Sequence, residues 1–532
     1  MAAGEDAGSH KADVDKLHEL GYAQELKRGM GGFSNFAVSF TIISILSGCL
    51  TLYYFGMAHG GPPTMLWGWL LVGVLVLIVG LAMAEVCSSY PTAGGLYYWA
   101  AKLAPGKSGP AWSWFTGWFN LLGQVAVTAG IDFGLAFFIG AFLTMVTGQT
   151  YWLSQGHTIA ILAVVLFVHG LLNTFGVRLV ALLNDISVWW HILGVLIIVV
   201  LLFAAPSSHT HQSASFLFSF DTNKGFQNLT GFSVLPFVFL LGLLNAQYTF
   251  TGYDASAHMT EETRNAAIAG PKGIVNSIWV SLVAGFVLLL GVSIALPTKY
   301  PFDSSFGTMT GYSDIAALLQ APAVIFEYAV GKVLAEIMLL IVIGAQFYCG
   351  MSSVTANSRM IYAFSRDGAM PGSAFWHRIN KRTRTPTNSI WFAAVGAFLL
   401  ALPYMWNTVA YGAVTSIAVI GLYIAYVLPV LMRRINSSAF VPGPFQLRRW
   451  SAPLGWIAII WVAFISVLFC LPNVKNDPFS WKLFNYTPIA LGVVILFAGG
   501  WYLLSARKWF KGPRVQGTHE ELEAIERELE AV

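Results

Sequence analysis

Apolar runs long enough to cross a lipid bilayer recur along almost the whole chain. A membrane-spanning helix needs about 20 apolar residues to cross roughly 30 Å of hydrocarbon. Only 10% of the 532 residues are charged, against about 25% in a typical soluble domain. The sequence therefore predicts one large helical bundle in the membrane, with the function inside it. We expect twelve spans, at residues 34–58, 64–87, 111–145, 157–174, 177–205, 234–260, 273–297, 325–358, 388–403, 409–432, 453–471 and 487–505.

The distribution of Lys and Arg predicts the orientation of the bundle, because cytoplasmic loops carry an excess of these residues. With the N-terminus in the cytoplasm, all but five of the 29 Lys and Arg lie on the cytoplasmic side, the exceptions being Lys224, Lys299, Lys332, Lys475 and Lys482. We expect a multi-pass protein of the plasma membrane with both termini in the cytoplasm. The same topology explains the basic clusters, so they do not indicate nucleic-acid binding.

The two ends of the chain are polar. No apolar core precedes a small-residue cleavage site, so we expect no cleavable signal peptide. The segment DKLHELGYAQELKR (15–28) has apolar residues at helical spacing and predicts a short helix along the cytoplasmic interface. The acidic segment EELEAIERELE (520–530) predicts a solvated helix.

Two predicted spans are interrupted at mid-depth, one in each half of the chain. Ser47-Gly48-Cys49 breaks the first apolar run, and TFTG (249–252) breaks the sixth. Because the breaks are five spans apart, the two spans cross the membrane in opposite directions. Glycine-interrupted spans at corresponding positions of two inverted halves are the sequence signature of a midplane binding site in transporters.

Unwound backbone inside a membrane has to face protein or a water-filled cavity, since unpaired N–H and C=O groups are costly in lipid. Freed N–H groups at a half-helix N-terminus suit a carboxylate, and freed carbonyls at a C-terminus suit an ammonium. A small zwitterion fits both. The alternative is that Gly48 and Gly252 only allow close helix packing.

Several motifs together resemble a known family. They are LGYAQELKR before the first span, PTAGGLYYW (91–99), FTGYDASAHMTEETRNAAIAGPKGI (250–274), NSRMIYAFSRDGAMP (357–371) and the RTRTP ahead of the ninth span. In this order, and on these loops, they resemble the amino acid–polyamine–organocation permeases, in the amino acid/choline transporter branch that includes γ-aminobutyrate permeases. The resemblance covers roughly residues 20 to 505.

The resemblance implies an all-α integral membrane fold of the leucine-transporter-like type. Two inverted repeats of five helices each are followed by two further helices, and substrate lies between the first and sixth helices. The implied division is a cytoplasmic segment 1–33, a first repeat 34–205, a second repeat 206–432, two final spans 433–505 and a cytoplasmic tail 506–532.

Site residues follow from the same resemblance. The family's G-[ST]-G of the first helix falls on Leu46-Ser47-Gly48, where the leading glycine is replaced, and F-x-G-[FY]-D of the sixth falls on residues 250–254. The implied substrate-binding residues are Ser47, Gly48, Cys49, Phe250, Thr251, Gly252, Tyr253 and Asp254.

Two members of this set have specific expected roles. Phe250 is the implied aromatic lid over the substrate; the alternative is that Phe250 and Tyr253 are packing aromatics. For Asp254 we expect that its carboxylate caps the half-helix that follows; the alternative is contact with a ligand cation.

The sequence contains no G-x-x-x-x-G-K-[ST] nucleotide loop, so energy has to come from an ion gradient or from exchange. His191 falls at the position of a lysine in proton-coupled members of the family. Because histidine titrates near pH 6.5, we hypothesise that His191 couples transport to protons, with Ser352, Ser353 and carbonyls of the first break as neighbours. The alternative is a hydrogen-bonded structural histidine. Sodium coupling is less favoured.

Other ionisable side chains in the spans are functional candidates by default, because charges are costly there. Asp132 is a candidate for selecting amines, and Asp132, Asp185 and Glu336 are equally compatible with structural pairing. His209 and His211 form the one candidate metal pair, but two histidines on a Ser-rich loop are typical of solvated side chains. We expect no metal and no cofactor.

The function predicted from the sequence is import of a small amino acid or related amine, with γ-aminobutyrate as the best candidate, by a proton-coupled alternating-access transporter that is a monomer or weak homo-oligomer. The alternatives are an exchanger, a polyamine or choline permease, a channel, and a transport-inactive amino acid sensor. No H-E-x-x-H or G-x-S-x-G motif indicates an enzyme.

Overall fold

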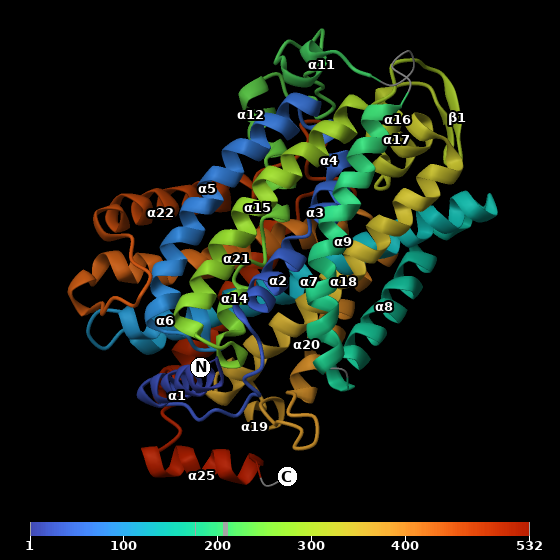
Figure 1. Cartoon of the computed structure of the whole chain (residues 1–532). Helices are drawn as coiled ribbons and strands as arrows, with labels where there is room; N and C mark the ends of the chain where they lie inside the picture. Colours follow the sequence, from blue (N-terminus) through green and yellow to red (C-terminus); the bar gives the residue numbers. More distant parts are fainter. Residues whose placement is uncertain (1, 176, 206–210, 531–532) are drawn as a thin grey trace.

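The computed structural model describes residues 2–175, 177–205 and 211–530. Its regular structure is helical apart from one short β-hairpin (Figure 1). In this part of the chain, eleven helices are long and apolar enough to cross a membrane. This observation confirms the prediction of a mostly helical membrane protein.

The long helices have the following bounds: α5 Gly61–Ser89, α7 Gly109–Thr147, α8 Gln155–Phe175, α9 Val177–Ala204, α15 Ala266–Ile294, α18 Lys332–Arg366, α20 Thr387–Ala401, α21 Val409–Ile435, α22 Ser451–Leu468 and α23 Thr487–Trp501. The remaining long apolar segment is formed by α2 (Gly32–Ile43) and α3 (Ile45–Thr51), and it continues into α4 (Tyr53–Ala58).

Two predicted spans differ from the helices in the structure. The sixth, 234–260, consists of short helices α12 (Leu235–Gly242), α13 (Leu244–Thr249) and α14 (Ala255–His258). The eighth was expected at 325–358, but α17 ends at Val330 and α18 begins at Lys332. The reason is Gly331, whose φ of 79° ends the first helix.

Helices α7 and α21 form the centre of the bundle. In the most apolar stretch of each, 83% of the residues are buried, against 17% for the stretch that contains α23. Close approach requires glycine here: a Cβ on Gly123 would lie 2.6 Å from the backbone nitrogen of Leu422, and one on Gly421 would lie 3.0 Å from Gly123. Small residues at such a crossing let two membrane helices pack backbone to backbone.

The two ends of the bundle are distinct (Figure 1). Helices α1 (Ala2–Glu19) and α25 (His519–Glu530) lie at one end, which we call the terminal side. The hairpin of β1 (Phe302–Ser304) and β2 (Gly307–Met309) lies at the opposite end, the loop side; Phe302 pairs with Met309 in antiparallel register.

Shorter helices complete the structure on both sides: α6 Gly95–Leu103, α11 Ala214–Phe218, α16 Tyr312–Ala316, α17 Ala321–Val330, α19 Ser373–Trp376 and α24 Arg507–Trp509. The solvated helix predicted at 520–530 is confirmed by α25. The helix predicted over 15–28 is only partly present, because α1 ends at Glu19 and Gly21, with a φ of 97°, turns the chain out of the helix.

Candidate functional site

The first helix break lies at Ser44, between α2 and α3. Ser44 has a left-handed backbone (φ 36°). Its N–H still donates to Phe40 O at 3.1 Å, while its carbonyl accepts from the N–H of Ser47 and Gly48 at 2.8 and 2.9 Å and so starts α3. The prediction that Ser47, Gly48 and Cys49 interrupt the helix is therefore wrong in position, because these residues form the first turns of α3.

The second break lies at Gly252, as predicted. Helix α13 ends at Thr249, Gly252 has a φ of 92°, and α14 starts at Ala255. A side chain is excluded as well, since a Cβ on Gly252 would lie 2.2 Å from Cγ2 of Ile42 in α2. The chain between α13 and α14 therefore turns directly against the first broken helix.

The two broken helices touch at Gly48 and Thr249. A Cβ on Gly48 would lie 2.6 Å from both Oγ1 and Cγ2 of Thr249 and 2.8 Å from its Cα. The fully buried Cys49 is the next residue of α3 and also interacts with Thr249. Gly48 thus has a packing role, as the alternative interpretation expected, and this packing brings the breaks together.

A small cavity lies between the two broken helices, and we call it the closed cavity because all the residues that line it are buried. Its volume is about 10 Å³, and it is lined by Ile42, Ile43, Ser47, Gly48, Ile131, Tyr248, Thr249 and Thr251. A space of this size holds about one water molecule. The helices therefore have to move apart before an amino acid fits between them.

Two tyrosines of α21 hold the second break. Tyr423 donates its hydroxyl to Phe250 O at 2.8 Å. Tyr426 accepts from the N–H of Gly252 at 3.3 Å and donates to the Asp254 carboxylate at 2.7 Å. The sequence analysis missed both residues, although their spacing of three along a helix places them on one face and was available as a signal.

Asp254 occupies the position before α14, but its side chain makes no capping hydrogen bond. The carboxylate instead accepts from Gln124 Nε2 at 2.8 Å and from the Tyr426 hydroxyl, and it lies 3.3 Å from Nε2 of His258. The expected capping role is therefore wrong. Side chains from α7, α14 and α21 satisfy this buried carboxylate, which ties the break to the central helices.

Phe250 and Tyr253 are packed against neighbouring aromatic rings. The Phe250 ring lies 4.4 Å from that of Trp69 in α5, and the Tyr253 ring lies 4.8 Å from that of Tyr426. Neither residue lines the closed cavity. In this closed conformation both are packing aromatics, and a lid role of Phe250 stays a prediction for a substrate-bound state.

His191 contacts the first break. Its Nε2 lies 2.7 Å from Ser44 Oγ, and its Nδ1 lies 2.7 Å from Ser187 O. The neutral ring with hydrogen on Nδ1 satisfies both contacts, because Nδ1–H donates to the carbonyl and Nε2 accepts from the serine. His191 therefore contacts the first break through the Ser44 side chain, and not through the break carbonyls that the sequence analysis expected.

Ser352 and Ser353 are not the expected neighbours of His191. Ser352 Oγ donates to Asn184 Oδ1 at 2.5 Å, and Ser353 Oγ lies 2.8 Å from Thr128 Oγ1. In the described part of the chain no hydrogen bond joins either hydroxyl to His191. Both serines face other helices, a placement that the sequence does not reveal.

A larger cavity of about 460 Å³ lies toward the terminal side, between α2, α9 and α18. Asp185 lines it and accepts from Ser34 Oγ at 3.2 Å. Glu262 and Arg359 also line it and form a buried ion pair with 2.8 Å between Oε1 and Nε. Charged side chains thus line this cavity, whereas none of the described residues that line the closed cavity is an Asp, Glu, His, Lys or Arg.

Arg28 connects the N-terminal segment to the chain that follows α14. Its guanidinium donates to Thr260 O at 3.1 Å and to Thr263 O. Burial lowers the pKa of Arg28, and the nearby Asp13 and the acidic pair Glu261 and Glu262 oppose that shift. The N-terminal segment is therefore fixed to the chain just after α14.

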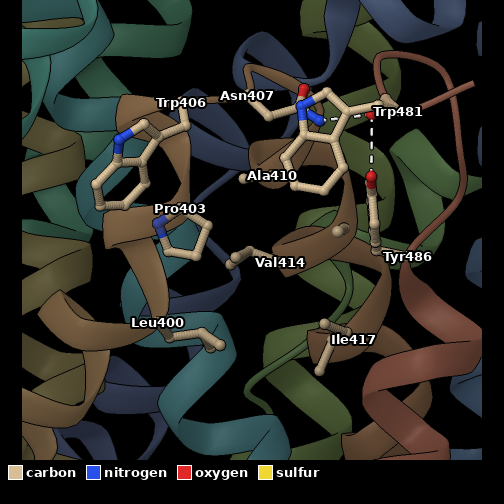
Figure 2. Close-up of a pocket in the computed structure, with 10 residues that line it drawn as sticks. Leu400, Pro403, Trp406, Asn407, Ala410, Val414, Ile417, Trp481 and Tyr486 are labelled. Carbon is tan, nitrogen blue, oxygen red and sulfur yellow. Dashed lines mark hydrogen bonds between the residues drawn. The ribbon is translucent and has the colours of Figure 1, made fainter.

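An apolar cleft of about 370 Å³ lies elsewhere, between α20, α21 and the chain before α23 (Figure 2). Trp406, Trp481 and Tyr486 line it together with aliphatic side chains. The side-chain amide of Asn407, which also lines the cleft, is already hydrogen-bonded, because its Nδ2 donates to Trp481 O at 2.6 Å. The cleft therefore offers no free charged group to orient a zwitterion, and the helix breaks are the better candidate site.

The metal prediction concerns residues at the edge of the described chain. His209 lies outside the described residues, and among those described no group of three His, Cys, Asp or Glu is arranged to hold a metal ion. Glu336 is half-buried on α18 and has no hydrogen bond or ion pair in the described part of the chain. We therefore assign none of these residues to the candidate site.

Fold and site together define a helical membrane protein in which two interrupted helices meet around a buried centre. Comparison with known proteins gives the family. A family model described as amino acid permease matches residues 30–496. The chain belongs to this family, within the amino acid–polyamine–organocation superfamily, and is a membrane transport protein rather than an enzyme, as the sequence predicted.

Relatives match the chain over nearly its whole length. "Amino-acid permease BAT1" of Arabidopsis thaliana is 44% identical over 506 residues, which cover 94% of this chain and 95% of that protein. Its homolog in Oryza sativa is 44% identical over 519 residues, with 96% and 97% covered. The "GABA-specific permease" of Saccharomyces cerevisiae is 30% identical over 510 residues, with 96% and 87% covered.

Proposed function

We propose that the protein is a secondary active transporter that imports a small amino acid or related amine by alternating access. The observation that carries the proposal is that the two helices broken at Ser44 and Gly252 pack against each other beside their breaks, with a small cavity between them. Half-helix ends at such a break offer N–H groups to a carboxylate and carbonyls to an ammonium. The closed cavity is then an occluded state, and substrate enters when the breaks separate.

We propose γ-aminobutyrate as the first substrate to test. One relative is a γ-aminobutyrate-specific permease at 30% identity, and this compound carries the two opposite charges that the half-helix ends suit. Other small amino acids fit the same chemistry. The 460 Å³ cavity between α2, α9 and α18 is the proposed route between the site and the cytoplasm.

The proposed layout is that of twelve spans with a five-plus-five inverted repeat, 34–205 and 206–432, in the plasma membrane. Both termini face the cytoplasm, so the terminal side is cytoplasmic. The broken α12–α14 segment supplies the twelfth crossing. Support comes from the matching positions of the two breaks in the two halves.

Transport is proposed to be coupled to protons rather than to sodium, with His191 as a coupling group. The support is the 2.7 Å contact of its Nε2 with Ser44 at the break. Protonation of Nε2 reverses this hydrogen bond, because the ring then donates and the serine has to accept. A change in charge next to the hinge of α2 and α3 gives a physical link between proton binding and opening.

Uptake into proteoliposomes tests the proposal. The purified protein is reconstituted, and radiolabelled γ-aminobutyrate, alanine, lysine, putrescine and choline are offered with and without an inward proton gradient. We expect accumulation of at least one amino acid that depends on the gradient, and counterflow of the same compound. Counterflow without accumulation would indicate an exchanger, and binding without either would indicate a sensor.

A further inference from the structure

A buried pair of ionisable side chains lies beside the candidate site without belonging to it. Asp132 of α7 and His169 of α8 are both fully buried. His169 Nδ1 lies 3.4 Å from the carboxylate oxygens of Asp132. Asp132 Oδ1 and His169 Nε2 have no hydrogen-bond partner among the described residues. The pair is therefore weakly satisfied for groups at this depth, and this is unusual for buried polar atoms.

In the described part of the chain, the groups around the pair do not neutralise the negative charge of an ionised Asp132 carboxylate. In the described part of the chain His169 is the partner that forms an ion pair with Asp132. Among the described residues, Tyr248 of α13 and Cys349 of α18 also interact with Asp132. Phenol and thiol are both uncharged near neutral pH, so neither compensates the negative charge.

One bound proton makes the pair electrically neutral. The proton can reside on the imidazole, giving an ion pair, or on the carboxylate, giving a neutral hydrogen-bonded pair. Loss of that proton leaves an uncompensated charge in a low-dielectric interior, which is strongly unfavourable.

Helix α18 connects the pair to the first helix break. A Cβ on Gly350 would lie 2.0 Å from Asp132 Oδ1 and 2.6 Å from His169 Cε1, so the helix backbone closes directly over both groups. The preceding residue, Cys349, donates its thiol to Ile42 O at 3.2 Å, two residues before the break at Ser44. A movement of α18 relative to α2 thus changes the contacts of the Asp132–His169 pair and those of the first helix break.

His191 differs from this pair in its hydrogen bonding. Both of its ring nitrogens have close partners, Ser187 O and Ser44 Oγ, and its neutral form satisfies both. Asp132 and His169 reach neutrality only with an added proton. We propose, on the basis of the proposed transport function, that Asp132 and His169 form a second proton-binding site, which holds a proton in the closed state and releases it when the bundle opens.

The test uses the full-length protein in proteoliposomes, with Asp132→Asn and His169→Gln as variants. Glu336→Gln is the matched control, because it also removes a carboxylate from a predicted span but lies away from the site. The substrate is γ-aminobutyrate or whichever member of the panel is taken up. We expect both variants to lose gradient-driven accumulation, so that the internal concentration equals the external one, and to retain counterflow. The control should accumulate as the unchanged protein does.

A second measurement does not depend on transport. Infrared spectra of the purified protein and of each variant at neutral pH, where the pair is proposed to hold its proton, report protonated carboxylic acids and imidazolium. We expect one carboxyl or imidazolium signal that is absent in both Asp132→Asn and His169→Gln and present in Glu336→Gln. This readout also applies to a variant that does not transport.

The outcomes separate the two proposals. Accumulation by Asp132→Asn with an unchanged pH dependence would overturn the second proton site, and so would infrared spectra identical to those of the unchanged protein. If the unchanged protein shows counterflow but ignores the gradient, proton coupling is wrong for both sites while transport stands. If it takes up no member of the panel, the proposed function fails, and the spectra alone decide whether the pair binds a proton.

Discussion

At the scale of single residues, the site depends on two left-handed backbone positions. Gly252 is visible in the sequence, because glycine in an apolar run is the usual sign of a helix that has to bend or part. Ser44 is not visible, because a serine is compatible with a continuous helix. Its conformation is held by the contact of its side chain with His191 in α9, a residue 147 positions away. Only a folded chain brings these two together.

Replacing Gly252 by alanine should abolish transport and lower thermal stability. A left-handed conformation costs an alanine roughly 1–2 kcal/mol, and its Cβ would overlap Cγ2 of Ile42, 2.2 Å away. Uptake and the thermal midpoint of the detergent-solubilised protein measure the effect. The buried thiols of Cys49, Cys87 and Cys349 give a convenient signal, since a thiol-reactive dye reaches them on unfolding.

Gly412→Ala is the matched control for that variant. Gly412 lies in α21, and a Cβ there would meet no atom within 4 Å. We expect unchanged uptake and a stability gain of at most about 1 kcal/mol from the higher helix propensity of alanine. Normal uptake by Gly252→Ala would contradict the role of the break.

At the scale of elements, α21 holds the second break in place. Tyr426 reaches both the N–H of Gly252 and the carboxylate of Asp254, whereas Tyr423 reaches a single carbonyl. The apolar content of α21 identifies it as a membrane-spanning helix, but the sequence does not show which face of this helix meets the break. That face is decided by the packing of α21 against α7 through Gly421 and Gly123.

Tyr426→Phe should destabilise the protein by about 1–3 kcal/mol, because it leaves buried hydrogen-bonding groups without their partner. Tyr423→Phe should have a smaller effect, since it removes one hydrogen bond to a carbonyl. Thermal midpoints compare the two variants, which delete the same atom from the same helix. Equal effects would show that the Asp254 contact does not stabilise the break.

The ion pair between Glu262 and Arg359 connects the chain after α14 to α18. Both side chains are buried, with at most 7% exposure. Glu262→Gln should destabilise by about 3–5 kcal/mol, because it leaves an unpaired buried charge. The double variant Glu262→Gln with Arg359→Gln should recover part of the loss. Thermal midpoints of the unchanged protein, the two single variants and the double variant give the coupling energy between Glu262 and Arg359.

Glu528→Gln provides the comparison for an exposed ion pair. Glu528 pairs with Lys381 at 3.5 Å, and both side chains are mostly exposed. We expect no measurable change in the thermal midpoint, as for most surface pairs. An effect as large as that of Glu262→Gln would mean that burial is not the reason for the predicted cost.

At the scale of the whole molecule, His59 links distant segments on the loop side. It follows α4, its Nδ1 lies 2.9 Å from Phe55 O, and its Nε2 lies 3.1 Å from Asn473 O. The backbone of His59 also forms an isolated antiparallel β-bridge with Asn228. Burial lowers the pKa of His59 from 6.5 to about 4, despite the two carbonyl contacts.

This shift predicts a specific loss of stability in acid. The unfolded chain binds a proton at His59 at a higher pH than the folded protein does, so the free energy of unfolding falls as pH drops from 6.5 toward 4 and is unaffected above that window. The full effect is on the order of 3 kcal/mol. Thermal midpoints of the unchanged protein and His59→Gln across this range measure it. The variant should lose less stability than the unchanged protein.

His10→Gln is the control, because His10 is an exposed residue of α1. Its midpoints should follow those of the unchanged protein at every pH. A His59→Gln curve parallel to that of the unchanged protein would contradict the lowered pKa of His59.

The sequence by itself determined the class of the molecule: runs of apolar residues fix a membrane bundle, because lipid admits only helices that satisfy their own backbone. It also located the break at Gly252, where the residue type carries the conformation. The tertiary structure decided the rest. The break at Ser44, the ties of Asp254 to Gln124 and Tyr426, and the pair of Asp132 and His169 arise from contacts between helices, and local residue preferences do not encode which distant side chain will satisfy a buried polar group.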